Sequence, residues 1–524
     1  MDISLFQLVV ICATIAVVLG FGIRAARSVH STKGFSVGGR SAGVPLVAGG
    51  IAGTCVGGGA TVGTAQLAAT VGLSAWWFTI GSGVGLIIMG LFYARPLRRT
   101  ALETIPQFLA QNFGVTCGVF SSIVSSIGIL FSAVASCLPA IYIIASIFGI
   151  SFLPATILLV LTVAAYAFFG GMKSAGVGGI LKMVVIWSTM AIAGVMAAHS
   201  LFADPAVAAA LPEGAFSLLH GDMSHILANF SSVVIGMLCT QSYIQAIFSA
   251  SNPRTASVAA FTAALISLPV GLPCAMVGIY MGAAHPEIMP ILSLPVYLLT
   301  EQPSLLGGIA MGGIMLSLIG SIAGLSLGIG TMLSRDIFHR ARVTLRARKI
   351  HKLAEDPENQ VIDITEIPTP NHPYHLSELA VTRLIVLLTI TLAAFIALAN
   401  EGSQVLFWNF LSMALRSGGI FLPLSFAIFA PGTITAMSAT LSMALSTAAA
   451  LIAVFLGAAG NPLFFGLAVS ALCLIPCWLR HRGYSSMQRR QVFFNFCGII
   501  NKMMKIFRNP CCLSRRGLLL FDRI

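Results

Sequence analysis

The sequence predicts an all-α polytopic membrane protein with about thirteen transmembrane helices. Of its 524 residues 57% are hydrophobic and only 9% are charged, which lies outside the range of soluble globular proteins. Apolar runs of about 20 residues, the length that crosses a hydrocarbon core, recur along the chain between short polar breaks. Lys and Arg gather in alternate breaks, as they do in the cytoplasmic loops of membrane proteins.

The apolar runs also predict the sidedness of the chain. Lys and Arg follow the first, third, fifth, seventh and ninth runs, whereas the loops after the second, fourth, sixth, eighth, tenth and twelfth runs contain neither residue. This alternation predicts that the amino terminus lies outside and the carboxyl terminus lies in the cytoplasm. The predicted spans are 3–23, 44–69, 73–94, 117–149, 151–170, 181–202, 227–249, 258–283, 304–333, 380–399, 405–429, 432–457 and 461–479.

The second apolar run contains the segment GGIAGTCVGGGATVGTAQ, residues 49–66, in which 7 of 18 residues are glycine. Each glycine inside a helix costs roughly 1 kcal/mol relative to alanine, and irregular backbone persists in a membrane only where it lines a cavity. The segment therefore predicts a broken helix. Polar residues interrupt a run again five spans later, at 236–250, and this spacing predicts a five-plus-five inverted repeat.

This repeat divides the chain into six parts. They are the first helix with its lead-in loop (1–43), the first five-helix repeat (44–202), an exterior loop (203–226), the second five-helix repeat with a cytoplasmic loop at 340–378 (227–430), two additional helices (431–479) and a basic cytoplasmic tail (480–524).

Several function classes are disfavoured by what the chain lacks. It has no GxxxxGK[ST], HExxH or paired CxxC motif, its glycine run does not fit GxGxxG, and its Asp and Glu residues lie in loops, tails or span edges. We therefore expect no enzyme activity, no cofactor and no bound transition metal. The net charge of +13 reflects sidedness, because no basic domain is long enough to bind nucleic acid. A channel or a transporter-like sensor remains an alternative, although a filter loop and a cytoplasmic sensor domain are both missing.

Four segments of the chain form a recognisable set in this order: GGRSAG (38–43), AYAFFGGMKSAGVGGILKMVVIW (165–187), TQSYIQAIFSASNPRTA (240–256) and SLIGSIAGLSLGIGTMLSRDIF (317–338). Together they resemble the sodium:solute symporter family, whose fold is that of the bacterial leucine transporter. The resemblance covers roughly residues 5–480.

The resemblance implies a sodium site where the break in the second span meets the ninth span. Main-chain carbonyls and hydroxyls are hard oxygen donors that suit Na⁺. The implied ligands are Gly53 and Val56 on the second span and Ser317, Gly320 and Ser321 on the ninth. The family usually has two adjacent hydroxyls where this chain has Gly320 followed by Ser321, so one ligand is lost.

A second departure concerns the start of the sixth span. The family has a Thr-Asp pair linked to cation passage where this chain has Gly178 and Gly179, and it has Gln where this chain has Lys182. Lys182 has two readings: its side chain extends to the membrane surface, or its ammonium replaces Na⁺, as in Na⁺-independent or proton-coupled relatives of this fold.

The resemblance also places a substrate site between the two broken helices. The implied residues are Cys55, Gly57, Gly58 and Gly59 on the first and Gln241 and Tyr243 on the second. Arg416 is the one cation deep within a span, where it either pairs with a carboxylated substrate or lies near a helix end.

The predicted function is secondary active transport of a small organic solute, such as an organic acid, an amino acid or a related metabolite. The resemblance favours Na⁺ as the coupling ion, and the alternative is a Na⁺-independent or H⁺-coupled carrier with Lys182 as the surrogate cation. Such a protein is a multi-pass component of the plasma membrane, or of the inner membrane in a bacterium. The partners are then the solute, Na⁺ or H⁺ and the lipid bilayer, and the sequence leaves the oligomeric state open.

Overall fold

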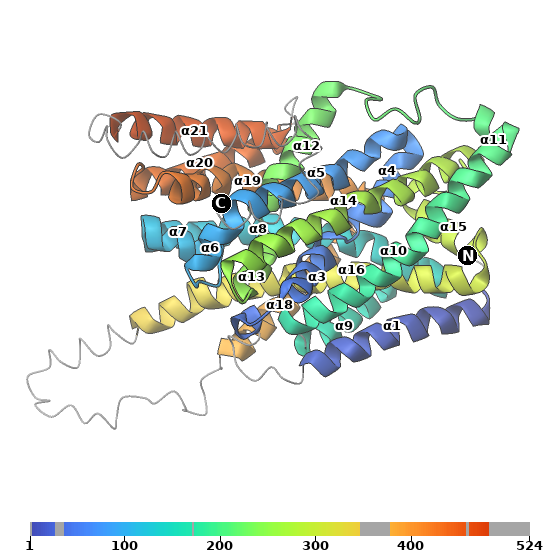
Figure 1. The fold of residues 1–524 in the computed structure, drawn as a ribbon, viewed down its shortest axis with the longest axis horizontal. Helices are drawn as coiled ribbons and strands as arrows, with labels where there is room; N and C mark the ends of the chain where they lie inside the picture. Colours follow the sequence, from blue (N-terminus) through green and yellow to red (C-terminus); the bar gives the residue numbers. More distant parts are fainter. Residues whose placement is uncertain (1–2, 27–35, 170–171, 346–377, 457–460, 482–524) are drawn as a thin grey trace, which may run out of the picture.

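The computed structural model describes residues 3–26, 36–169, 172–345, 378–456 and 461–481, and this part of the chain is a bundle of helices without strands (Figure 1). Most of the predicted cytoplasmic loop at 340–378 and of the tail at 480–524 lies outside the described residues. The long helices run roughly side by side, as expected of a chain that must satisfy its backbone hydrogen bonds within each membrane span.

Long helices form the body of the bundle, and short helices and turns connect or interrupt them. The long helices are α1 (Leu5–Ala26), α8 (Val115–Phe148), α9 (Phe152–Phe169), α10 (Met172–Ala203), α12 (Met223–Leu238), α14 (Pro253–Ala284), α16 (Ser304–Met332), α18 (Glu378–Ala399), α19 (Val405–Phe429), α20 (Ala436–Phe455) and α21 (Pro462–His481). The short elements are η1 (Gly38–Arg40), α3 (Val44–Cys55), η2 (Gly59–Gly63), α4 (Thr64–Val71), η3 (Gly72–Trp76), α5 (Trp77–Ile88), η4 (Met89–Tyr93), α6 (Ala94–Arg99), α7 (Ile105–Phe113), α11 (Pro205–Ala209), α13 (Gln241–Ser249), η5 (Pro290–Leu292), α15 (Ser293–Thr300) and η6 (Leu333–His339).

Within the described residues, 11 helical segments are long and apolar enough to cross a membrane. The number differs from the predicted thirteen because helical turns join residues 59–99 into one segment that covers parts of two predicted spans. In addition, α9 has only a short apolar stretch of described residues, Phe152–Ala167. The thirteen spans, the sidedness of the termini and the six-part division stay predictions.

The predicted break in the glycine-rich segment is present. Helix α3 ends at Cys55 because Val56 leaves the helical region with φ −80° and ψ 82°. Residues 56–58 interrupt the helix, and the chain resumes with the π-helical turn η2 before α4. The break therefore falls where the glycines lie closest together.

The second predicted break lies between α12 and α13. Cys239 and Thr240 separate the two helices, and Thr240 has an extended backbone with φ −87° and ψ 112°. Its hydroxyl donates to the carbonyl of Gly236 at 2.7 Å, which satisfies one acceptor at the end of α12.

The middle of the bundle is formed by α8 and α16, whose apolar windows are 83% and 78% buried within the protein. By contrast α1 and α21 are each 22% buried, and Figure 1 places them on opposite edges of the bundle. The interrupted helix α3 packs against α10, α14 and α16. Its break therefore lies in the interior, where an irregular backbone can bind ions or solutes.

Candidate functional site

The two broken helices meet at a small central cavity of about 20 Å³. Its wall includes the predicted substrate residues Cys55, Gly57, Gly58, Gly59 and Tyr243. The other lining residues come mainly from α5, α8 and α19: Thr54, Ala60, Phe78, Ser82, Ser132, Ser136, Leu325, Asn409 and Met413. The volume is that of about one water molecule, so the cavity is too small for an organic solute in this conformation.

Gln241 lies outside this cavity, although the family resemblance implied a role in substrate binding. Its side-chain carbonyl accepts from the Ile105 amide at 2.9 Å, and its amide donates to the Glu103 carbonyl at 3.0 Å. Both partners flank the start of α7. Gln241 therefore joins α13 to α7, and Tyr243 alone of the two predicted α13 residues lines the cavity.

The side chain of Lys182 occupies the predicted cation site. Its Nζ donates hydrogen bonds to the main-chain carbonyl oxygens of Gly53, Val56 (2.9 Å) and Ser317 (3.2 Å). A lysine ammonium has three N–H donors, and three carbonyls are available for them here. Lys182 is 2% exposed, so the reading in which its side chain extends to the membrane surface is wrong.

The other predicted cation ligands border the same site. The Ser317 hydroxyl donates to the Val56 carbonyl at 2.6 Å, and the Ser321 hydroxyl donates to the Thr54 carbonyl at 2.9 Å. A Cβ at Gly320 would lie 3.6 Å from the Lys182 Nζ. The structure thus brings Gly53, Val56, Ser317 and Gly320 around the lysine ammonium, and Ser321 contacts the broken helix next to them through Thr54.

Glycine contacts between α3 and α10 bring Lys182 to this position. A Cβ added at Gly53 would lie 2.6 Å from the Cα of Gly179, and a Cβ at Gly179 would collide with the Gly49 carbonyl. Small residues let membrane helices approach until their backbones touch. The glycines of this segment therefore serve helix packing as well as the break.

Arg416 lies in the interior of α19 and is 0% exposed, so the reading in which it lies near a helix end is wrong. Its Nη1 donates to the hydroxyl of Ser412 at 2.9 Å and to that of Ser132 at 3.2 Å. Its Nε and Nη2 are buried and have no hydrogen-bond partner in the described part of the chain. Ser132 also lines the central cavity.

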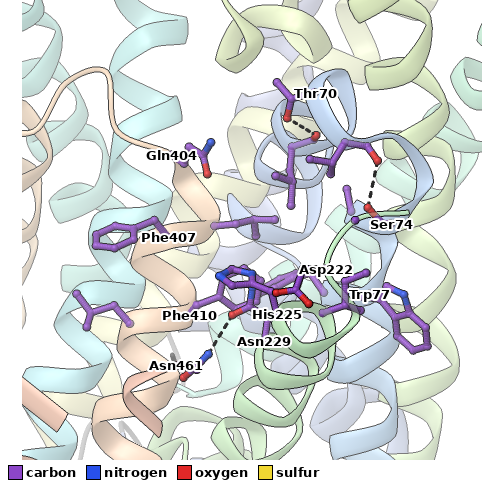
Figure 2. A pocket seen from close by; sticks show the side chains of 18 of the residues that line it. Thr70, Ser74, Trp77, Asp222, His225, Asn229, Gln404, Phe407, Phe410 and Asn461 are labelled. Atoms are coloured by element: carbon purple, nitrogen blue, oxygen red, sulfur yellow. Dashed lines mark hydrogen bonds between the residues drawn. The ribbon is translucent and has the colours of Figure 1, made fainter. Parts of the chain in front are cut away.

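A larger cavity of about 580 Å³, the vestibule, lies beside the start of α5 (Figure 2). Phe78 lines both the vestibule and the central cavity, and its ring packs edge-on against Phe410 with centroids 5.8 Å apart. The Phe78 ring therefore lies between the two cavities. The polar side chains around the vestibule are Thr70, Ser74, His220, Asp222, His225, Asn229, Gln404 and Asn461.

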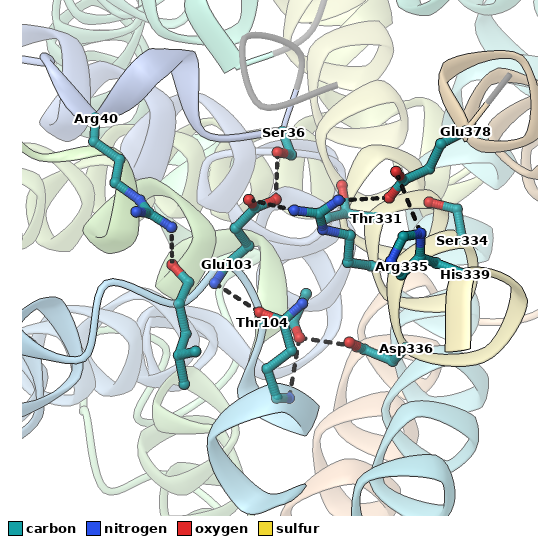
Figure 3. A network of polar contacts seen from close by, with 12 residues as sticks. Ser36, Arg40, Glu103, Thr104, Thr331, Ser334, Arg335, Asp336, His339 and Glu378 are labelled. Carbon is teal, nitrogen blue, oxygen red and sulfur yellow. Dashed lines mark hydrogen bonds and ion pairs between the residues drawn. The ribbon is translucent and has the colours of Figure 1, made fainter. Parts of the chain in front are cut away.

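A network of ion pairs lies toward the other end of the bundle, beyond α6 (Figure 3). Arg335 binds Glu378 at 2.7 Å and Glu103 at 3.0 Å, and the Ser36 hydroxyl donates to Glu103 at 2.7 Å. Close by, the Thr104 hydroxyl donates to Asp336 at 2.8 Å. The network joins the start of α18 to η6 and to the loop before α7.

Sequence reasoning missed most of these residues. Ser132, Ser136 and Asn409 line the cavity from helices whose sequences are otherwise ordinary apolar spans. A serine or asparagine within such a span is a weak signal on its own. Glu103 and Arg335 lie at span edges, where charged residues are common. No pattern in the sequence therefore predicts that they form an ion pair.

Comparison with known proteins places the chain in a family. It matches the sodium:solute symporter family over residues 35–354. The human high affinity choline transporter 1 is 25% identical over 334 residues, which cover 58% of this chain and 55% of the human protein. The Torpedo marmorata high-affinity choline transporter 1 is 24% identical over 341 residues, which cover 59% of this chain and 56% of that protein. The matched regions thus span about half the length of these relatives.

Two solved structures share the fold. A Na⁺-coupled sialic acid symporter, solved in a substrate-bound outward-open state, aligns with TM-score 0.71 and 16% identity over 92% of this chain and 98% of its own. A nucleobase-cation-symport-1 family transporter in a closed conformation with bromovinylhydantoin bound aligns with TM-score 0.55 and 11% identity over 89% of this chain and 100% of its own. At these identities the likeness concerns the fold, and it confirms the predicted leucine-transporter-like architecture.

The family match covers more than half of the chain and includes both broken helices and the residues around Lys182. The family and the relatives named above are transporters, which supports a role in transport and not in catalysis. The chain is a multi-pass plasma-membrane protein of the sodium:solute symporter family.

Proposed function

We propose that this protein is a secondary transporter of a small organic solute in which the Lys182 ammonium replaces the sodium ion at the central cation site. The observation that carries the proposal is the set of three hydrogen bonds from the Lys182 Nζ to the carbonyls of Gly53, Val56 and Ser317. Gly53 and Val56 are the main-chain ligands that the family resemblance implied for Na⁺.

Electrostatics argues that the site holds one cation at a time. Two unit charges 4 Å apart repel by about 4 kcal/mol at an effective dielectric of 20. None of the ion pairs between described residues involves Lys182, so no carboxylate offsets a second positive charge there. Na⁺ would therefore have to displace the ammonium from carbonyls that it already satisfies.

The arrangement of the cavities supports alternating access. The vestibule approaches the central cavity from one end of α5, and the ion-pair network closes the bundle beyond α6. The contracted central cavity lies between the two closures. A transporter that opens one solute site to each side of the membrane in turn needs a barrier between the site and each side.

Na⁺-coupled symport is the second candidate, because the family match and the Ser317 and Ser321 hydroxyls favour it. It requires the Lys182 side chain to leave the three carbonyls during the cycle. The choice between the two cations does not identify the solute. The relatives are named for choline, and from them we infer for this chain only that it transports a small organic solute.

Uptake into proteoliposomes separates the two candidates. Purified protein would be tested with a panel of labelled organic acids, amino acids and choline, under an imposed Na⁺ gradient, an imposed H⁺ gradient or neither, with K⁺ replacing Na⁺ and protein-free liposomes as the control. We expect uptake of at least one solute that is unchanged when Na⁺ is removed. A strict requirement for Na⁺ would contradict the proposal and favour Na⁺-coupled symport, and the H⁺ gradient shows whether a proton takes the coupling role.

A further inference from the structure

We propose that Arg416 binds the carboxylate of the transported solute, so that this carrier takes small organic acids. The inference rests on the proposed function in one respect, because it takes the central cavity as the solute site. It does not depend on which cation drives transport.

Within the described part of the chain, the Arg416 guanidinium lacks hydrogen-bond partners for most of its nitrogens. Two of its three nitrogens, Nε and Nη2, are buried without a hydrogen-bond partner among the described residues. Its remaining nitrogen, Nη1, donates to two serine hydroxyls. A guanidinium presents its donors in a planar fork that matches a carboxylate, so the two unused nitrogens leave a bidentate site open.

Arg416 lies next to the central cavity. Ser132 accepts from Arg416 at 3.2 Å and itself lines the central cavity, so a single hydroxyl separates the guanidinium from the solute space. Contact between a solute and the guanidinium then requires the contracted cavity to expand past Ser132 toward α19.

The buried cations around the central cavity have no acidic partners among the residues that the structure describes. Neither Arg416 nor Lys182 takes part in an ion pair between described residues, and both are at most 2% exposed. The central cavity has no Asp or Glu in its lining. Burying an unpaired charge is strongly unfavourable, and a buried arginine in a membrane span marks a functional partner. A solute carboxylate supplies the missing negative charge.

The same balance selects among solutes that carry a carboxylate. An amino acid would bring a second ammonium, although the lining has no acidic side chain and the carbonyls of Gly53, Val56 and Ser317 already accept from Lys182. A quaternary ammonium cation such as choline would add a third positive charge beside Lys182 and Arg416. An organic acid without an amino group is therefore the solute class that fits.

A purely structural role accounts less well for Arg416. The hydroxyls of Ser132 and Ser412 already hydrogen-bond each other at 2.7 Å, and Ser412 donates to the Gly128 carbonyl. Helices α8 and α19 are thus joined without the guanidinium. Arg416 adds a bond to each serine through Nη1 and leaves its other two nitrogens unused.

Ligand binding by the purified full-length protein tests the proposal without any ion gradient. Thermal shifts would be measured in detergent and Na⁺-free buffer with acetate, lactate, pyruvate and succinate, with glycine and proline as amino acids, with glycerol as a neutral solute and with choline. We expect one or more of the acids to stabilise the protein, and glycine, proline, glycerol and choline to leave it unchanged.

Three variants identify the residue that binds the acid. Arg416→Gln should weaken the binding by about 10- to 100-fold, the effect of losing hydrogen bonds to a charged group. Arg416→Lys should retain part of the affinity because it keeps the charge. Arg99→Gln removes one positive charge from an exposed position and should bind as the wild type does.

A second measurement needs no ligand. Because the Arg416 charge is buried and unpaired, Arg416→Met should raise the melting temperature of the ligand-free protein. The proposal would be overturned by a lower melting temperature in this variant. It would also be overturned if choline bound, if no acid in the panel bound, or if Arg416→Gln still bound the acid. The proposed cation scheme fails separately, through a Na⁺ requirement for uptake by the wild type.

Discussion

At the scale of single residues, Lys182 is the feature that sets this chain apart from the pattern its family resemblance implies. The family has Gln at this position and two adjacent hydroxyls on the ninth span, whereas this chain has Lys182 and Gly320. The two departures are consistent with each other, because a Cβ at Gly320 would lie 3.6 Å from the Lys182 Nζ. A serine at Gly320 would supply a ligand that the ammonium makes unnecessary.

Rebuilding the sodium site therefore requires both positions. We expect Lys182→Ala to reduce uptake by about tenfold or more, because the Gly53, Val56 and Ser317 carbonyls lose their donor. The double variant Lys182→Ala, Gly320→Ser should regain uptake only in the presence of Na⁺. The measurement is solute uptake into proteoliposomes by the single and the double variant, each in Na⁺ and in K⁺.

The matched control is Lys173→Gln, which removes a lysine charge from the same helix, α10, nine residues earlier. This variant should transport as the wild type does, with no change in its response to Na⁺. Full activity of Lys182→Ala in K⁺ would show that the ammonium has no role in transport.

At the scale of elements, the contact between α3 and α10 positions both the break and the lysine. The helices approach closely because glycines face one another, and a Cβ at Gly53 would lie 2.6 Å from the Cα of Gly179. Backbone atoms on a packed helix cannot move aside as a flexible side chain can, so the contact should tolerate no added methyl group.

Gly53→Ala should therefore destabilise the protein by about 1–3 kcal/mol, the usual cost of overpacking, and should also displace the Gly53 carbonyl from Lys182. The control is Gly20→Ala in α1, since a Cβ at Gly20 has no atom within 4 Å. Melting temperatures of the two purified variants provide the comparison. Equal melting temperatures would mean that α3 and α10 are not in backbone contact.

At the scale of the whole molecule, we propose that the central cavity is closed on two sides by different chemistry. On the vestibule side the closure is the apolar pair Phe78 and Phe410. On the opposite side it is the network in which Arg335 joins Glu103 and Glu378. The Cys55 thiol lies in the cavity between them and reports access from either side.

Removing Arg335 should open the network side. The background is a variant that retains Cys55 as its sole cysteine. In it, Arg335→Gln should increase the rate of Cys55 labelling from the network side by about fivefold or more. A shift of about 1 kcal/mol in the equilibrium between closed and open conformations produces a change of this size. Membrane-impermeant maleimide added to one face of sealed vesicles measures the rate. Arg99→Gln should leave it unchanged, and an unchanged rate in Arg335→Gln would show that the network does not close the cavity.

Shortening Phe78 should have the mirror-image effect. Phe78→Ala removes one of the two rings between the vestibule and the central cavity, so Cys55 should be labelled faster from the vestibule side and at the same rate from the other side. Phe407→Ala is the control, because Phe407 lines the vestibule but not the central cavity. Equal acceleration from both sides would indicate general loosening of the bundle.

The sequence by itself determined the features that depend on composition and local pattern. The helical membrane architecture follows from the length of the apolar runs, and the two breaks follow from glycine and polar residues that a continuous span disfavours. The family motifs placed Gly53, Val56, Ser317, Gly320 and Ser321 in one site, and the structure brings these residues together.

Only the tertiary structure decided where the long side chains point. From the sequence, Lys182 fitted the membrane surface as well as the cation site, because its four-carbon stem reaches either. The close approach of α3 and α10 selected the cation site. The pairing of Glu103 with Arg335, the exclusion of Gln241 from the cavity and the unpartnered nitrogens of Arg416 likewise depend on contacts between distant segments. Such contacts are set by helix packing, and no local pattern in the chain encodes them.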